Sequence, residues 1–571
     1  MTFTPAVTEQ RFVLDHVAGI AELTENEKFA DATPDLIDAV LEGVGAFAAG
    51  EWAPLDRIGD TVGAKWTPEG VVMPEGFGAA YRAYVEGGWG TIGSPPKYGG
   101  QGLPAVLSAA VLETLGTANA SFALAPTLTV GAIEALMHHG TPEQQAAYLP
   151  KLATGEWTGT MNLTEPSAGS DVGALKTRAE PVGDGTFEIT GTKIFISFGD
   201  HDMVDNIVHL VLARTPDAPA GTKGLSLFLV PKYRLDADGN PGEWNDVTVA
   251  SIEHKMGLHG SPTCVLNFGD KGDCIGTLIG PELGGIAAMF TMMNNARLNV
   301  GLEGVQVAER ATQRAVAFAR ERIQSARAGS PSRESVAIIE HPDVRRMLMR
   351  MKAQTMAARA LVYRAFAMLD RAHLGDKAAK KMLDLLTPMA KAHATDLGSE
   401  ITDLGIQVHG GMGFVEETGA AQQYRDCRVF RIYEGTNGIQ AADLVGRKLS
   451  MDGGETALGL IAAIRTAAQS PNLAALADAL EEITKGLLAA EVDDRLAASY
   501  PYLTMFSVAV CGWLLEKQAA AAIGDSEFEA MKRAATAFYV DQIVPEALGL
   551  KAAATARADV LYSVSAETFA A

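Results

Sequence analysis

The spacing of apolar and polar positions changes along this chain of 571 residues and divides it into four zones. In residues 1–160, apolar residues recur at helical spacing between Gly and Pro breaks, as in PDLIDAVLEGVGAFAAGEWAP and LPAVLSAAVLETLG. This pattern predicts a helical N-terminal domain over residues 1–160.

Residues 161–280 contain short stretches rich in β-branched and aromatic residues, separated by Gly, Asp and Pro. The stretches are FEITGTKIFIS, NIVHLVLAR, GLSLFLVPK, NDVTVASIEH and TCVLNFGD. Such runs are typical of strands, and their spacing predicts a compact antiparallel barrel or sandwich. We therefore expect a middle β-domain over residues 161–280.

Amphipathic helical patterns return over residues 281–450, beginning with one helix of about 40 residues from LGGIAAMF to RERI. Residues 451–571 are rich in Ala and Leu and predict an appended C-terminal helical domain. The predicted class is thus an α+β multidomain protein. It lacks the alternating strand and helix order of a Rossmann domain, and neither YGGQG nor HGGMGF completes a dinucleotide-binding or P-loop motif.

The charge balance bears on possible partners. The net charge is −22, and the C-terminal zone includes the acidic stretches EEITKGLLAAEVDD and DSEFEA. A surface of this sign repels nucleic acid and anionic membranes, so we expect no nucleic-acid partner.

The four cysteines lie far apart without a CxxC pair, which is typical of a reducing compartment and gives no zinc pattern. The N-terminal stretch has acids early and no apolar segment, so no signal peptide is expected. The apolar run at 508–515 is too short to span a membrane. Neither His138-His139 nor His201-Asp202 has the i, i+4 spacing or the third partner of a metal site, and we expect no metal.

Two stretches offer backbone that a ligand can approach closely. MNLTEPSAGSDVGALKTRAE, residues 161–180, combines hydroxyls with small residues whose successive amides could bind a polar ring edge or an anion. GIQVHGGMGF, residues 405–414, has paired glycines that admit a phosphate or an adenine. The alternatives are a capped surface turn for the first stretch and a helix C-cap for the second.

A third stretch, FRIYEGTNGIQ at residues 430–440, holds one acid, Glu434, in mostly apolar company. Burial among such neighbours raises the pKa of a glutamate from about 4.3 toward neutrality, as a general base working at physiological pH requires. Gly435 leaves room for a ligand. The alternative is a glutamate that caps a helix or pairs with Arg431 or Arg428.

Four motifs follow one another along the chain: LTEPSAGSD, GTKIFIS, QVHGGMGF and RIYEGTNGIQ. In combination and in this order, they resemble the acyl-CoA dehydrogenase family over residues 50–450. The longer chain, with NIVHLVLAR, HKMGLHGSPTCV and FTMMNNARLNVG, resembles the branch that contains the bacterial 3-methylmercaptopropionyl-CoA dehydrogenases of dimethylsulfoniopropionate breakdown. The resemblance implies a helical domain, a β-domain and a helical bundle with FAD bound between them.

The implied reaction is the dehydrogenation of an acyl-CoA to a trans-2-enoyl-CoA. Glu434 matches the base that removes the α-proton while the β-hydride passes to flavin N5. In the family, the backbone N–H of the base and a ribityl hydroxyl polarise the thioester carbonyl. The expected substrate is 3-methylmercaptopropionyl-CoA, with short- or medium-chain acyl-CoAs of general fatty-acid oxidation as the alternative.

The resemblance also carries over the ligand contacts, residue by residue. The implied FAD contacts are Met161, Leu163, Thr164, Gly169, Ser170, Phe195, Ile196, Ser197, Arg322, Gln407, Gly410, Gly411, Thr436 and Gly438. The implied substrate contacts are Ser170, Asn294, Arg297, Tyr433 and Gly435.

A few positions depart from the family pattern. Phe195 and Ser197 stand where Trp and Thr are common, which keeps an aromatic cover and a hydroxyl. Ser325 replaces an aromatic residue after Arg322, and the longer loop there puts a cofactor contact from His341 in doubt. One subgroup carries its base on the long helix, where this chain has Ala296.

The resemblance further implies electron-transferring flavoprotein as acceptor, a homo-oligomer with a dimer favoured over a tetramer, and the bacterial cytoplasm. Two other classes share the fold: a DNA-associated flavoprotein, which the acidic C-terminal zone disfavours, and an acyl-CoA oxidase-like enzyme that passes electrons to oxygen.

Overall fold

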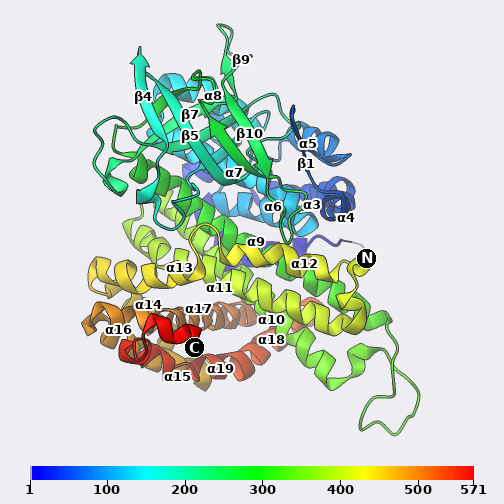
Figure 1. The fold of residues 1–571 in the computed structure, drawn as a ribbon. Helices are drawn as coiled ribbons and strands as arrows, with labels where there is room; N and C mark the ends of the chain where they lie inside the picture. The colour runs from blue at the N-terminus through cyan, green and yellow to red at the C-terminus, as the bar shows by residue number, and fades with distance from the viewer. Residues whose placement is uncertain (1–2) are drawn as a thin grey trace. The chain divides into compact units, whose positions relative to one another are not determined.

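The computed structural model describes residues 3–571, which form two compact units. One unit comprises residues 28–296; the other comprises residues 297–571 with the N-terminal segment up to Glu27. The element order along the chain is helical, then β, then helical, as the sequence predicts (Figure 1). The domain boundaries at residues 160, 280 and 450 remain a proposal.

The helices of the unit 28–296 have clear start signals. Helix α3 (Pro34–Phe47) begins after the N-cap Thr33, and α8 (Pro142–Thr154) begins with a capping box. The others are α4 (Asp56–Val62), α5 (Phe77–Glu86), α6 (Ala105–Ala118) and α7 (Ala120–His139). Helix α7 is long and apolar enough to span a membrane, but 78% of its most apolar window is buried inside the fold. A core helix has this character.

The same unit contains an eight-stranded sheet in the order β10-β11-β5-β12-β7-β6-β3, with β4 paired to β5. Its strands are β3 (Thr158–Asn162), β4 (Arg178–Gly183), β5 (Thr186–Ser197), β6 (Ile207–Ala213), β7 (Ser226–Pro231), β10 (Val247–Ile252), β11 (Thr263–Phe268) and β12 (Ile275–Ile279). All five predicted strands are confirmed. The predicted antiparallel pairing holds except between β3 and β6, which run parallel. The unit also contains two short two-stranded sheets. One pairs β1 (Lys65–Thr67) with β2 (Gly70–Val72), and the other pairs β8 (Tyr233–Leu235) with β9 (Pro241–Trp244).

The other unit is helical. The predicted long helix is α9 (Gly285–Glu321), most of which lies in this unit. It is followed by α10 (Pro342–His373), α11 (Lys377–His409), α12 (Ala420–Cys427) and α13 (Asn437–Asp443). The C-terminal zone forms α14 (Glu455–Ala467), α15 (Pro471–Ala489), α16 (Val492–Ala497), α17 (Ser499–Ala521), α18 (Glu527–Phe538) and α19 (Val544–Leu548).

Buried charges tie the C-terminal helices into this unit. Lys532 on α18 donates to Glu9 of the N-terminal segment at 2.6 Å, and Arg359 on α10 donates to Glu309 on α9 at 2.8 Å. All four side chains are buried. Since an unpaired buried charge is very costly, these pairs fix which helices pack together. The C-terminal helices are therefore an integral part of this unit.

Helices α9 and α11 cross closely because glycines face the partner backbone. A Cβ at Gly304 would lie 2.4 Å from the carbonyl oxygen of Ala394, and one at Gly301 would lie 2.7 Å from that of Ala390. No side chain fits at such distances. The crossing brings the residues flanking these glycines on α9 against the middle of α11.

We predict that Gly304→Ala destabilises the protein, because the added methyl forces α9 and α11 apart; overpacking of this kind costs about 1–3 kcal/mol. Gly486→Ala is the matched control, since Gly486 is also a helix glycine but has open space around its Cβ position. That change should be neutral or stabilising by up to about 1 kcal/mol. Thermal unfolding of both variants is the measurement; equal midpoints would contradict the close crossing.

Candidate active site

Glu434 lies in a short loop between the 3₁₀ turn η11 (Arg428–Arg431) and α13. Its φ is 54°, a left-handed conformation that costs a non-glycine residue about 1–2 kcal/mol. The next residue, Gly435, has φ 82°, where glycine is favoured. Strain of this kind persists only when the surroundings impose it, and it is common at functional sites.

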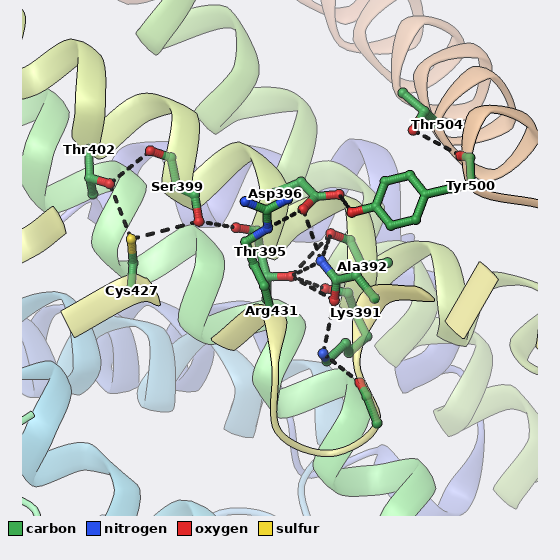
Figure 2. A network of polar contacts seen from close by, with 12 residues as sticks. Lys391, Ala392, Thr395, Asp396, Ser399, Thr402, Cys427, Arg431, Tyr500 and Thr504 are labelled. Atoms are coloured by element: carbon green, nitrogen blue, oxygen red, sulfur yellow. Dashed lines mark hydrogen bonds and ion pairs between the residues drawn. The ribbon is translucent and has the colours of Figure 1, made fainter. Parts of the chain in front are cut away.

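Hydrogen bonds from both sides hold this loop. Lys391 on α11, fully buried, donates to the carbonyl oxygen of Gly435 at 2.8 Å and to Asn437 Oδ1 at 2.9 Å (Figure 2). Gln440 Nε2 donates to the carbonyl oxygen of Glu434 at 3.1 Å. These donors turn the two carbonyls inward and so impose the left-handed backbone.

The Glu434 carboxylate is half-buried and makes no hydrogen bond or ion pair with any residue in the range 3–571. Burial raises its pKa to about 7, and the charges of Arg297 and Lys391 counteract this only in part. Arg431 is one of the two arginines that the sequence offers as ion-pair partners for Glu434, but it pairs with Asp396 at 2.6 Å. The carboxylate is thus free to accept a proton near neutral pH.

A second buried carboxyl, Glu303 on α9, accepts a hydrogen bond from the Tyr433 hydroxyl. Burial raises the pKa of Glu303 to about 8; the Tyr433 hydrogen bond opposes this, and the charge of Glu434 adds to it. Glu303 is therefore largely protonated at pH 7, and Glu434 is the stronger acid of the two.

Glu303 and Lys391 are not among the site residues that the sequence motifs predict. Both stand alone in apolar runs, LNVGLEGVQV and LTPMAKAHA, and helical spacing puts each of them on the face that is buried. An isolated charge on an apolar helix face is a usable signal, because such a residue needs a partner inside the fold.

Arg297 is buried and lies beside the loop: a Cβ at Gly435 would be 3.9 Å from its Nη2. The same Cβ would be 2.8 Å from Gln440 Nε2, so the position accepts only glycine without rearrangement. The Nε of Arg297 is buried and has no hydrogen-bond partner among residues 3–571. An unused buried donor next to the carboxylate suits a polar or anionic ligand group.

The predicted site residues of this unit therefore fall into two groups. Arg297, Tyr433, Glu434 and Gly435 are brought together. Arg322, Gln407, Gly410 and Gly411 are exposed at the ends of α9 and α11, which lie alongside each other where Phe318 stacks on His409 at 4.5 Å. Two further residues follow the base: the Thr436 hydroxyl caps α13 by accepting from the N–H of Ile439, and Gly438 is exposed.

In the unit 28–296, the two stretches predicted to flank a flavin are neighbours. The N–H of Ile194 donates to the carbonyl oxygen of Thr164 at 2.9 Å, and Lys193 Nζ donates to that of Leu163 at 3.1 Å. Lys193 also forms a buried ion pair with Glu165 at 2.8 Å. The end of β3, which carries Met161, is thereby fixed against the end of β5.

This surface suits a planar ring. Phe195 is 59% exposed and in a left-handed conformation at φ 59°, so it presents its ring outward. Ser197 is half-buried, whereas Ile196 is in the sheet core, so only its backbone can face a ligand. Gly169 and Ser170 are exposed. Asn294, predicted to contact substrate, is half-buried on α9 in this unit.

Comparisons with known proteins agree along the whole chain. Family models for the N-terminal, middle and C-terminal domains of acyl-CoA dehydrogenase match residues 37–156, 160–270 and 284–449. A model described as acetyl-CoA dehydrogenase C-terminal like matches residues 455–565. The C-terminal helical zone thus corresponds to a recognised extra domain.

The chain is 43% identical to the 3-methylmercaptopropionyl-CoA dehydrogenase of Ruegeria pomeroyi, over 99% of this chain and 100% of that protein. It is 38% identical to a butyryl-CoA dehydrogenase of Syntrophomonas wolfei, over 90% of each chain. Its fold resembles the crystal structure of the acyl-CoA dehydrogenase of Bacillus anthracis complexed with FAD, with a TM-score of 0.73, 22% identity and coverage of 94% and 91%. The chain belongs to the acyl-CoA dehydrogenase family of FAD-dependent oxidoreductases.

Proposed function

We propose that this chain oxidises an acyl-CoA thioester to its trans-2-enoyl-CoA, with Glu434 as the base. The observation that supports this most is an unpaired carboxylate with a pKa near 7 on a strained loop. A base that is ionised at neutral pH and lacks a competing partner is what abstraction of a weakly acidic α-proton requires.

In the proposed mechanism, Glu434 takes the α-proton while the β-hydrogen leaves as a hydride with the electron pair of its C–H bond. Bound FAD supplies the hydride acceptor. The backbone N–H of Glu434 donates to no acceptor among residues 3–571, so it is available for the thioester carbonyl as negative charge develops there. One such donor is typically worth ~3 kcal/mol.

We infer that the acyl chain is short and that 3-methylmercaptopropionyl-CoA is the substrate. The support is the Ruegeria relative, which matches over its full length. Butyryl-CoA is the alternative, because the Syntrophomonas relative also matches over 90% of its length. The 3-methylmercaptopropionyl chain is longer than butyryl by one heavy atom, and an apolar pocket separates chains that differ by one such group by only ~1–3 kcal/mol.

We further propose electron-transferring flavoprotein as the acceptor, a homodimer as the assembly and the bacterial cytoplasm as the location. The exposed positions of Arg322, Gln407 and Gly410 support a dimer, since they are then free to reach the FAD of a partner subunit. Four buried free cysteines among the described residues suit a reducing compartment.

We predict that 3-methylmercaptopropionyl-CoA bleaches the flavin of the purified anaerobic protein faster than butyryl-CoA or octanoyl-CoA does. Glu434→Gln should slow this reduction roughly 10²–10⁴-fold, because the amide cannot take the α-proton. Stopped-flow absorbance of the flavin is the measurement. The flavin content of the variant is the control, and reduction of the variant at the native rate would rule out Glu434 as the base.

The pH profile provides a separate test. The apparent second-order constant for flavin reduction reports groups of the free enzyme. Since a base works only when ionised, this constant should fall about tenfold per unit below pH 7 and level off above it, following the pKa of Glu434. A profile that is flat from pH 5.5 to 8 would contradict this assignment.

Glu303→Gln is the control that distinguishes the titration of Glu434 from that of Glu303. A glutamine still accepts the Tyr433 hydrogen bond, and Glu303 is largely neutral at pH 7 in any case. We therefore expect the rise near pH 7 to persist in this variant. If the rate constant of Glu303→Gln no longer rose near pH 7, the group that titrates there would be Glu303 and not Glu434.

A further inference from the structure

The carboxylate of Asp396 on α11 meets both ends of the loop that carries Glu434. Arg431 lies three residues before Glu434, and its Nε forms an ion pair with Asp396 Oδ1 at 2.6 Å. Asn437 lies three residues after it, and its Nδ2 donates to the same oxygen at 3.0 Å. One oxygen atom therefore fixes the entry and the exit of the strained loop (Figure 2).

The other oxygen of Asp396, Oδ2, accepts a hydrogen bond from the C-terminal zone. Tyr500, on the first turn of α17, donates its hydroxyl to Oδ2 at 2.7 Å, and Figure 2 shows its ring reaching across from the α17 ribbon. Helix α17 also packs against α11 and α13. The contact thus joins the appended domain to the two helices that flank the base loop.

Partners on both oxygens restrict rotation of the Asp396 carboxylate more than partners on Oδ1 alone. With Oδ2 free, rotation of the Asp396 side chain would let Oδ1 leave Arg431 and Asn437. Asn437 would keep its bonds to Ala392 and Thr395. Among residues 3–571, by contrast, Asp396 is the one acidic residue that forms an ion pair with Arg431. The entry side of the loop is therefore the side that depends on Tyr500.

We propose that Tyr500 of the C-terminal helical domain is a positioning residue for Glu434, acting through Asp396 and Arg431. This inference rests on the proposed function of Glu434. It assigns the appended domain a part in ordering the active site: the domain supplies the group that holds the Asp396 carboxylate. The burial of Tyr500 and the Asp396 charge raise the pKa of the phenol, so it remains a donor throughout the working pH range.

Tyr500→Phe tests this with little loss of packing, and Tyr502→Phe is a matched control. Tyr502 is also on α17 and is fully buried, but its hydroxyl meets Thr484 at 2.7 Å, within the C-terminal zone. We expect Tyr500→Phe to reduce flavin roughly tenfold more slowly, as loss of one hydrogen bond to a charged group implies. The Kd for acyl-CoA and the flavin content should not change.

A misplaced base makes proton transfer more rate-limiting. The isotope effect with α-deuterated acyl-CoA should therefore rise in Tyr500→Phe and stay native in Tyr502→Phe. Asp396→Asn, which retains the shape but loses the charge that pairs with Arg431, should reproduce the pattern of Tyr500→Phe. Equal rates and isotope effects in Tyr500→Phe and Tyr502→Phe would overturn the proposal.

Amide hydrogen exchange of the peptide spanning 428–441 gives a readout that does not need turnover. We expect faster exchange there in Tyr500→Phe and native exchange in Tyr502→Phe. If no acyl-CoA bleaches the native flavin, the proposed function fails, while the exchange data still decide whether Tyr500 orders the loop. Unchanged exchange in Tyr500→Phe would reject the positioning role.

Discussion

The arrangement of this site depends on the attachment of one strained loop to helix α11. Glu434 holds a backbone conformation that it would not adopt alone, and Lys391 and Asp396 compensate by bonding the residues on either side. Both anchors need α11 at a fixed place, which the glycine-lined crossing with α9 provides. Helix packing therefore places the anchors, and their polar contacts hold the base in its conformation.

The electrostatics follow from the same packing. Burial raises the pKa of Glu434 and of Glu303, and the charge of Lys391 opposes the rise at both carboxyls. Glu434 has a second cation, Arg297, that lowers its pKa, whereas the negative charge of Glu434 raises the pKa of Glu303 further. Glu303 is instead engaged by a neutral hydroxyl from Tyr433. Two carboxyls close together thus acquire different proton affinities, a condition for giving them separate roles.

The sequence predicted the element types well, because helical and strand periodicities are strong over long segments such as α9 and β5. Its motif and its apolar neighbours led to the proposal of Glu434 as the base. The sequence could not predict that Arg431 pairs with Asp396, or that Tyr500 reaches the same carboxylate, because these contacts join residues far apart in sequence. The parallel pairing of β3 with β6 was not predicted for the same reason, because the local periodicity of a strand does not depend on which strand it pairs with.

The most direct test of the central claim is proton exchange at the α-carbon of the substrate. The native holoenzyme is incubated anaerobically with 3-methylmercaptopropionyl-CoA in D₂O, and deuterium in the recovered thioester is located by NMR. The account predicts that deuterium enters the α-carbon with the native protein and not with Glu434→Gln. Exchange at the native rate in Glu434→Gln would contradict Glu434 as the base.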